Sequence, residues 1–369
     1  MRILFVSTIY PTPAEPGKGV FNRNLVRALS AWHEVAVLAP VPWTVDRPWR
    51  QPVALAPDGS RVLDGVRVHH PRYYYPPKLL ASRAGWFYWR SVRATVDRLL
   101  RSFRPDVVLG YWAYPDGAAA VRIARETGGR SAVIVGGSDV LIDTRSAARR
   151  RRVVEVLRSA DAVLSVSDDL RQKAVELGVR PDRSHLWRQG VATDLFRPGD
   201  RSVARVRLGI PDADPVVVWV GRMVPVKGLD ILVRACGRLK EQGVGFRLYL
   251  VGDGPLRRVL EADCRALGVC DRVTFAGPCG HEQLADWYRA ADLTVLPSRS
   301  EGLPNVLRES VSCGTPFVAS RVGGIAEIAE AALDRLVPPE DPAALAEAIA
   351  AALAGRAARP QRRYRPLGW

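Results

Sequence analysis

The sequence predicts an α/β protein built from two Rossmann-like domains that face a cleft. Its 369 residues are enough for two domains of ordinary size. Short runs of apolar, β-branched residues alternate along the chain with helix-length amphipathic segments, which is typical of parallel sheets covered by helices. A stretch rich in Pro, Gly and Asp at residues 196–215 separates two such series and indicates the domain boundary.

The first domain is expected at residues 1–200. Its predicted strands are apolar throughout and do not alternate with polar residues, as expected of buried parallel strands. They are Ile3–Val6, Val35–Leu38, Val107–Leu109, Ala132–Val135 and Ala162–Val166. The helices between them are predicted at Phe21–Ala31, Asp116–Glu126, Arg149–Ser159 and Asp168–Leu177.

The second domain is expected at residues 201–355, followed by a basic tail at 356–369 without helical periodicity. Its predicted strands are Val216–Val220, Arg247–Val251, Arg272–Phe275, Leu293–Leu296 and Phe317–Ala319. The helix after Gly228 carries apolar residues three and four positions apart, which predicts a face packed on a core. Ligands of such sheets bind beyond the carboxyl ends of the strands, so the loops after the strands are the places to look for chemistry.

The net charge of +16 is distributed unevenly. Residues 1–200 carry a net +12, and residues 201–369 carry +4. The first domain is therefore expected to meet something anionic, although a general preference for Arg on the surface explains much of the excess. A nucleic acid is not the expected partner, because no RNP, zinc-finger or helix-turn-helix pattern is present.

Cysteine usage and hydropathy predict a cytoplasmic protein, with any membrane contact peripheral at the inner face of the plasma membrane. The five cysteines form no C-x-x-C pair, so neither a disulfide framework nor a zinc site is expected. The N-terminal apolar run Ile3–Val6 is shorter than a signal peptide needs. The segment Tyr73–Arg90 interleaves aromatic and basic residues, a pattern that fits contact with an anionic membrane and core packing equally well.

The loop after the strand Leu293–Leu296 is the first candidate site. Glu301 precedes a predicted helix start at which Pro304 fits the first helical position, and free N–H groups there bind anions. Glu309 lies about 8 Å further along that helix. The loop thus offers a carboxylate, backbone donors and a second carboxylate, in the order in which a nucleotide sugar presents sugar hydroxyls, a diphosphate and ribose hydroxyls. Two isolated glutamates are more often a surface acid and a partner of the helix dipole. The backbone positions are Gly302, Leu303, Pro304 and Asn305.

A second loop, at residues 221–228, favours the nucleotide-sugar interpretation of the two glutamates. Arg222 and Lys227 follow Gly221 between a strand and a helix, and an Arg–Lys pair suits a diphosphate. Taken alone, the pair is as well explained as a solvated basic turn. Both loops follow strands of one domain, and this agreement favours a site.

Together, G-R-x4-K-G at 221–228 and E-x7-E at 301–309 resemble the donor-binding motifs of retaining glycosyltransferases of family 4, the glycosyl transferases group 1, which have the GT-B fold. The resemblance implies that Arg222 and Lys227 hold the donor diphosphate, that Glu301 and the backbone after it contact the transferred sugar, and that Glu309 binds ribose. Catalysis would be electrostatic, without a metal or a cofactor. The partners implied are a nucleoside diphosphate sugar and a carbohydrate or lipid-linked acceptor.

Further positions match the family pattern less fully. Gly19 corresponds to one glycine of a turn near the donor phosphate, and Gly277 and Cys279 lie where relatives wrap the nucleotide base. On the acceptor side, Tyr111 and Asp139 belong to segments similar to those of cell-surface polysaccharide transferases of the teichuronic acid type. Relatives often carry His where this chain has Tyr111 and Gly136, and for Asp139 an N-cap role is the simpler interpretation.

Two other functions remain open on the sequence. A nucleotide-sugar epimerase or hydrolase could use the same two-domain scaffold. The chain also ends after its basic tail, where family members continue into segments that cross back onto the first domain, so an inactive, truncated relative is the other alternative. Neither a metal nor a nicotinamide cofactor is expected, because Asp212 and Asp214 lie in a Pro-flanked linker and Arg257 stands where a dinucleotide fingerprint needs its third Gly.

Overall fold

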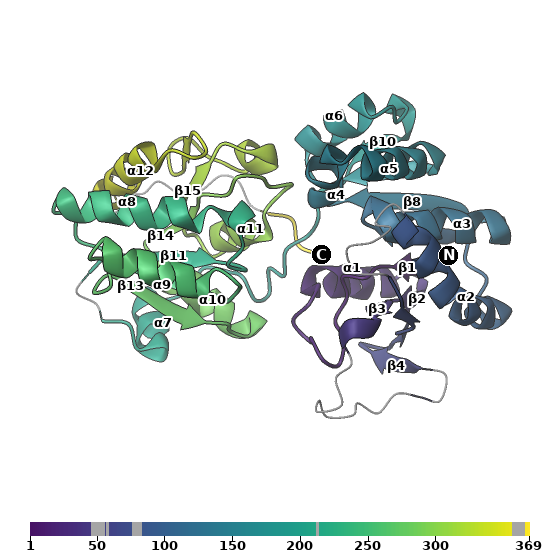
Figure 1. Ribbon diagram of the computed structural model, residues 1–369. Helices are drawn as coiled ribbons and strands as arrows, with labels where there is room; N and C mark the ends of the chain where they lie inside the picture. The colour runs from purple at the N-terminus through teal and green to yellow at the C-terminus, as the bar shows by residue number, and fades with distance from the viewer. Residues whose placement is uncertain (46–55, 57–58, 76–82, 212–213, 356–365) are drawn as a thin grey trace. The chain divides into compact units, whose positions relative to one another are not determined.

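The computed structural model describes residues 1–45, 56, 59–75, 83–211, 214–355 and 366–369 (Figure 1). The chain forms two compact units, residues 1–189 with Trp369 and residues 190–368. The division therefore falls earlier than the boundary expected near residue 200. Phe196 explains why this stretch belongs to the second unit, because its buried ring packs against His281 and Tyr288 at centroid distances of 5.0 and 5.9 Å.

The first unit contains an eight-stranded sheet in the order β10-β9-β8-β7-β1-β2-β5-β4. All neighbouring strands are parallel except β4 and β5. A parallel pair, β3 with β6, stands apart from it. The bounds are β1 Arg2–Val6, β2 Glu34–Leu38, β3 Val41–Pro42, β4 Ser60–Leu63, β5 Val66–His69, β6 Arg72–Tyr73, β7 Val107–Tyr111, β8 Arg130–Val135, β9 Ala162–Ser165 and β10 Ser184–Leu186.

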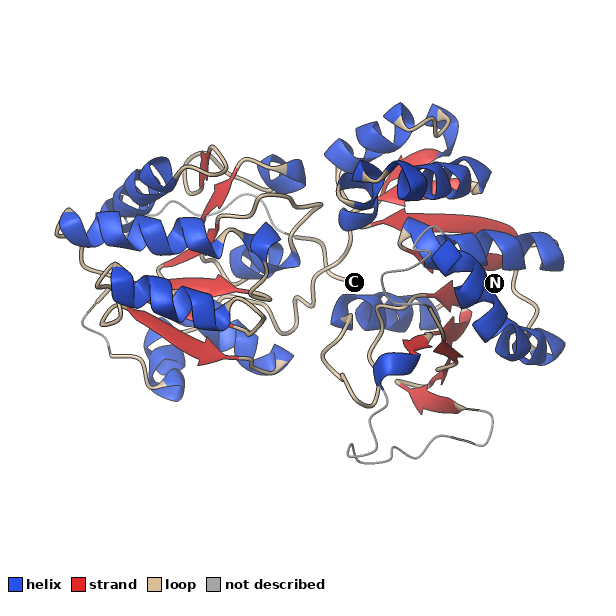
Figure 2. Ribbon diagram, in the orientation of Figure 1, coloured by secondary structure: helices blue, strands red, loops and turns tan. Residues whose placement is uncertain are grey.

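Helices cover this sheet because its strands are apolar on both sides (Figure 2). Leu4 and Val6 of β1 face the helices α2 and α3, where Val92 and Ile123 belong to the same buried cluster. The helices are α1 Val20–Ser30, α2 Ala84–Ser102, α3 Ala118–Thr127, α4 Ser138–Leu141, α5 Ala147–Ser159 and α6 Asp168–Glu176. A short kinked segment, η3 (Ala113–Gly117), joins β7 to α3.

The five strands and four helices expected in this unit are present, with small shifts of their ends. The sequence reasoning missed α2, the pair β3–β6, the edge strand β10 and the hairpin β4–β5. The hairpin turns at Asp64 and Gly65, both in the left-handed region with φ of 51° and 77°. An Asp-Gly pair between two strands is a strong hairpin signal, so this element was predictable.

The second unit contains a six-stranded parallel sheet in the order β13-β12-β11-β14-β15-β16. The strands are β11 Val216–Val220, β12 Arg247–Val251, β13 Val273–Gly277, β14 Leu293–Leu296, β15 Phe317–Ser320 and β16 Arg335–Val337. The helices are α7 Arg201–Leu208, α8 Leu229–Glu241, α9 Arg257–Ala266, α10 His281–Ala290, α11 Asn305–Ser312 and α12 Pro342–Ala354. All five strands expected here are present, and β16 was missed.

Strand β11 shows why both faces of this sheet are covered. Val217 and Trp219 pack into a cluster with α8, α9 and α12, whereas Val216 and Val218 pack into another with α7 and α10. Successive side chains of a strand point to opposite faces, so an entirely apolar strand must be buried on both.

Helix α7 corrects the expectation of an irregular linker at residues 196–215. Asp200 caps the helix by accepting from the Val203 N–H at 3.1 Å, and Gly209 ends it with a left-handed φ of 65°. Arg201 and Arg205 reach the buried Asp292 at 2.6 and 2.7 Å. Charged residues therefore anchor α7 to the sheet, which is why apolar periodicity failed to reveal it.

The aromatic and basic segment Tyr73–Arg90 falls partly on residues 76–82, outside the described part of the chain. From Ala84 onward it is the start of α2, with Tyr88 fully buried and Trp86 57% exposed. The segment therefore contributes both to the core and to the surface. Among the described residues, no helix combines the length and hydropathy that a bilayer crossing requires.

Most of the basic tail, residues 356–365, lies outside the described residues. Of its described end, Leu367 accepts a hydrogen bond from the Val191 N–H at 2.8 Å. The backbone at the end of the chain thus meets the first residues of the second unit.

Candidate active site

Three glycines allow the loops at the carboxyl edge of the second sheet to touch through their backbones. A Cβ on Gly228 would lie 2.0 Å from the Pro297 carbonyl oxygen, and one on Gly323 would lie 1.9 Å from that of Glu301. A Cβ on Gly252 would meet the Gly221 carbonyl oxygen at the same short distance of 1.9 Å. The loops after β11, β12, β14 and β15 consequently form one packed assembly.

Two of the predicted site residues meet in this assembly. Lys227 ends a short 3-10 turn, and its Nζ lies 2.6 Å from Glu301 Oε1. The Ser298 hydroxyl donates to the same carboxylate oxygen at 2.7 Å. The side chains are 25% and 10% exposed, so the pair is mostly shielded from water but still accessible. Glu301 is therefore held in one orientation beside a cation.

Arg222 lies on the same loop as Lys227, five residues before it, and is exposed. Within the described part of the chain its guanidinium has no hydrogen-bond or ion-pair partner. The loop that carries it is fixed by its backbone, since the Met223 N–H donates to the Asp253 carbonyl at 2.9 Å. Gly221 before it has φ of 153°, which strains any residue with a side chain, and its Cβ position lies 3.3 Å from the Trp219 ring, a tight contact. The loop thus presents an available cation on a rigid backbone.

The helix start after Glu301 differs in detail from the expectation. Pro304 is the N-cap, with φ of −71° and ψ of 119°, and the helix begins at Asn305. The proline ring fixes φ in either position, but the extended ψ leaves Pro304 outside the helix. Gly302 accepts from the Gly324 N–H at 2.8 Å, which ties this loop to the next one. Leu303 is partly buried against the sheet cluster.

Glu309 lies one helical turn further along α11. Its carboxylate accepts from the Tyr288 hydroxyl at 3.1 Å, and burial raises the pKa of Glu309 to about 7. Tyr288 is fully buried in α10 and was missed by the sequence reasoning. Its place on the apolar face of that helix is visible in the sequence, but its partner, 21 residues away, is not.

Of the two predicted base-binding residues, Cys279 lies near this pair. Gly277 ends β13 with φ of 77°, and its Cβ position is open. Cys279 packs against the buried cluster that contains Tyr288, and burial raises the pKa of its thiol. The structure thus brings Cys279 to the cluster that supports Glu309.

In the first unit, Gly19 has the role that a tight turn requires. It is the N-cap of α1 with φ of 64°, and a Cβ there would lie 2.4 Å from the Ile9 carbonyl oxygen. Asn22 donates to the same oxygen at 2.7 Å, so the turn after β1 is closed onto the helix start.

Tyr111 ends β7 and is buried. Its ring lies beside Phe21 with centroids 5.3 Å apart. A Cβ on Gly136 would lie 2.7 Å from the Tyr111 hydroxyl oxygen and 3.1 Å from Trp112 Nε1. Tyr111 therefore occupies the space that a side chain at position 136 would need. The two departures from the family pattern are sterically linked.

Asp139 is not an N-cap, which corrects the simpler of the two interpretations. The cap of α4 is Gly137, and Asp139 lies inside the first turn, where it is 1% exposed. It accepts from the Ala113 N–H at 3.2 Å and the Gly137 N–H at 3.0 Å. Burial raises its pKa to about 6. Asp139 joins the loops after β7 and β8.

Asp116 is a buried polar residue that the sequence reasoning passed over. Its carboxylate accepts from the Thr8 N–H and hydroxyl at 3.0 and 2.8 Å and from the Tyr88 hydroxyl at 2.8 Å. Burial raises its pKa to about 6. The segment η3 is therefore fixed to the end of β1 and to α2.

Comparison with known proteins gives this architecture a family. Residues 17–190 match the profile described as Glycosyl transferase 4-like domain, and residues 214–355 match Glycosyl transferases group 1. A sucrose-phosphate synthase from Thermosynechococcus elongatus has a similar structure, with a TM-score of 0.79, 25% identity and coverage of 96% of this chain and 90% of that one. Anabaena Alr3699/HepE, solved in complex with UDP-glucose, aligns with a TM-score of 0.70, 21% identity and coverage of 97% and 95%.

Among sequence relatives, D-inositol 3-phosphate glycosyltransferase from Acidothermus cellulolyticus is 42% identical over 217 residues, which cover 54% of this chain and 48% of the relative. The chain spans about half the length of the curated relatives that it matches. These relatives are named for D-inositol 3-phosphate and not for teichuronic acid, so the narrower likeness gains no support from them. The chain has the GT-B fold, with a glycosyl transferase 4-like domain at residues 17–190 and a glycosyl transferases group 1 domain at residues 214–355.

Proposed function

We propose that the protein transfers a sugar from a nucleoside diphosphate sugar to a hydroxyl acceptor with retention of the anomeric configuration. The observation that carries the proposal is the ion pair of Lys227 and Glu301 on the loop assembly that also presents Arg222. The Lys227 ammonium, 2.6 Å from the Glu301 carboxylate, can bind a donor phosphate in place of that carboxylate. The Glu301 carboxylate then accepts hydrogen bonds from sugar hydroxyls.

The charge of each site residue determines the role that we assign to it. Arg222 and Lys227 stabilise the negative charge that develops on the departing diphosphate, assisted by the first N–H groups of α11. Glu301 and the backbone of Gly302 to Asn305 contact the sugar, and Glu309 accepts from ribose hydroxyls. These positive groups let the reaction proceed without a metal. The UDP-glucose bound to the Anabaena protein supports this class of donor.

For the acceptor we propose an anionic, hydroxyl-bearing molecule. The relatives are named for D-inositol 3-phosphate, and a phosphorylated cyclitol is consistent with the net +12 of residues 1–200. A lipid-linked sugar in polysaccharide or glycolipid synthesis has the same chemistry of an anion next to hydroxyls. We further propose a cytoplasmic protein that contacts the membrane peripherally through exposed aromatic residues such as Trp86.

The first test is ligand-detected NMR binding against UDP-, GDP- and ADP-sugars, followed by turnover with D-inositol 3-phosphate and with a lipid-linked acceptor. A product assay with the acceptor omitted separates a transferase from a hydrolase or epimerase. The anomeric configuration of the product tests retention, and turnover in EDTA tests metal independence. Binding of no nucleotide sugar in the panel would contradict the proposal.

Substitution tests the assigned residues. Lys227→Ala and Glu301→Gln are each expected to lower kcat/KM about 100-fold or more, because each removes a group that acts on developing charge. Lys240→Ala, on the exposed end of α8, is the matched control and should leave turnover within twofold of the wild type. Near wild-type turnover in both site variants would refute the assignment.

A further inference from the structure

A pocket of about 890 Å³ lies wholly within the first unit, between α2, α3, α5 and η3. Its wall is aromatic, with Trp86, Phe87, Tyr88 and Trp89 from the first turns of α2 and Tyr114 from η3. None of the assigned donor groups lines it. The pocket is therefore separate from the groups assigned to the nucleotide sugar.

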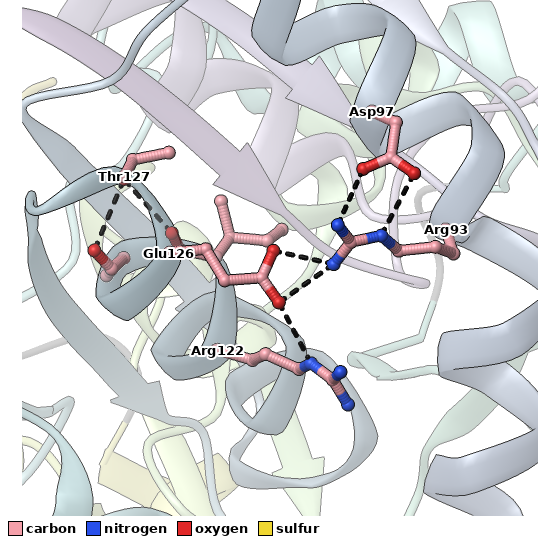
Figure 3. A network of polar contacts seen from close by, with 7 residues as sticks. Arg93, Asp97, Arg122, Glu126 and Thr127 are labelled. Carbon is pink, nitrogen blue, oxygen red and sulfur yellow. Dashed lines mark hydrogen bonds and ion pairs between the residues drawn. The ribbon is translucent and has the colours of Figure 1, made fainter.

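Four arginines and a single glutamate also line the pocket: Arg83, Arg122, Arg125, Arg152 and Glu155. Arg152 pairs with Glu155 at 3.1 Å, and Arg122 pairs with Glu126 at 3.2 Å. Figure 3 shows Glu126 shared between Arg122 and Arg93, with Asp97 on the far side of Arg93. The acids near the pocket are thus already engaged.

Arg83 and Arg125 differ from the other two. Both are exposed, and neither has a carboxylate partner within the ranges that the structure describes. Arg122 is held over the Trp89 ring, with its guanidinium carbon 4.4 Å from the ring centroid, so the aromatic wall itself carries positive charge. The pocket is consequently suited to an anionic group joined to an apolar body.

The surface beside the pocket indicates which kind of anionic ligand fits, a soluble nucleotide or a membrane lipid. The rings of Trp43, Tyr74, Phe87 and Trp86 follow one another at centroid distances of 5.5, 6.0 and 4.9 Å. Trp43, Tyr74 and Trp86 are 44%, 48% and 57% exposed, and we call these three the aromatic shelf. Binding of a soluble nucleotide does not require exposed aromatic side chains beside the pocket, whereas aromatic side chains next to arginines are typical of the membrane interface.

We infer that this pocket binds one anionic phospholipid. Its anionic head group meets the arginines of the lining, of which Arg83 and Arg125 have no carboxylate partner among the described residues. Its acyl chain follows the wall from Trp86 to Tyr114, and the aromatic shelf rests in the interface of the surrounding bilayer. The inference deepens the proposed membrane contact and does not depend on the donor chemistry, so either can fail without the other.

The test uses dihexanoyl phosphatidylglycerol below its critical micelle concentration, titrated into the full chain by calorimetry. We expect one saturable site. The double variant Arg83→Gln/Arg125→Gln should weaken binding at least tenfold, because it removes the two lining cations that have no carboxylate partner in the described part of the chain. The matched control, Arg98→Gln/Arg101→Gln, changes the charge equally at the other end of α2 and should stay within twofold.

A second variant, Ala118→Leu, fills the pocket without changing its charge and should also weaken binding, with folding checked by circular dichroism and UDP-sugar binding. Four results would overturn the inference: no binding, equal losses in both arginine variants, equal affinity for dihexanoyl phosphatidylcholine, or displacement of the lipid by UMP. None of these measurements uses turnover, so failure here leaves the donor assignment untouched.

Discussion

Glu309 shows at the residue scale how a binding group acts against stability. Burial raises its pKa from 4.5 to about 7 in the folded protein, so folding disfavours the ionised carboxylate. Its contribution to stability is complete below pH 4.5 and is lost as the pH rises through 7. A residue retained at such a cost is consistent with the proposed contact to ribose hydroxyls.

Glu309→Gln is therefore expected to raise the free energy of unfolding by about 1–3 kcal/mol above pH 7 and to leave it almost unchanged near pH 4.5. The amide oxygen can still accept from Tyr288. Urea denaturation at pH 4.5, 6 and 8 measures the difference. The same variant should bind the donor about tenfold more weakly. A stability gain that is equal at all three pH values would contradict the pKa shift as its cause.

The site residues themselves differ in how far the sequence could predict them. Lys227 and Glu301 were both selected from their loops, yet their contact spans 74 residues and depends on how two loops pack. Asp116 and Tyr288 were missed because a buried carboxylate or phenol has no local signature in the sequence. Each is recognised by a partner distant in the sequence, Thr8 for Asp116 and Glu309 for Tyr288.

At the scale of elements, Gly228 connects two loops of the site. It has φ of 64°, and a Cβ there would lie 2.0 Å from the Pro297 carbonyl oxygen. Gly228→Ala therefore combines left-handed strain with a collision against backbone, and should destabilise the protein by about 3 kcal/mol or more. Donor binding should fall with it, because Lys227 precedes this residue.

Gly243→Ala is the matched control. Gly243 has a similar φ of 71° but nothing within 4 Å of its Cβ position, so only the strain of about 1 kcal/mol is expected. Thermal unfolding of the two variants isolates the collision. Equal losses would show that the loop contact is unimportant.

Elements were predictable where their own residues specify them. The buried strands of both sheets are continuous apolar runs, and at this length such runs are typical of strands buried on both faces. Helix α7 was missed because its anchors are arginines that reach Asp292. Helix α2 was missed because its first turns are rich in aromatic and basic residues that serve both the core and the pocket.

At the scale of the whole molecule, the charge asymmetry is the feature that sequence alone predicts. The net +12 of residues 1–200 includes Arg83 and Arg125, which have no carboxylate partner among the described residues. Because unpaired surface charges are screened by salt, binding to anionic vesicles should be salt-dependent.

Co-sedimentation with vesicles containing 30% phosphatidylglycerol, a composition of about one anionic lipid in three, is expected to fall severalfold between ~0.1 and ~0.5 M NaCl. Vesicles of phosphatidylcholine alone are the control and should bind weakly throughout. Binding that is insensitive to salt would indicate a purely apolar contact with the aromatic shelf.

The steric link between Tyr111 and Gly136 has a consequence for protein engineering. Because the Tyr111 hydroxyl fills the position of a side chain at 136, grafting a histidine onto Gly136 alone would collide with it. Such a graft fits only if the Tyr111 side chain moves or is replaced by a smaller residue. A mutant library should therefore vary residues 111 and 136 together. A library that varies position 136 alone will miss larger side chains that become compatible only when Tyr111 is also changed.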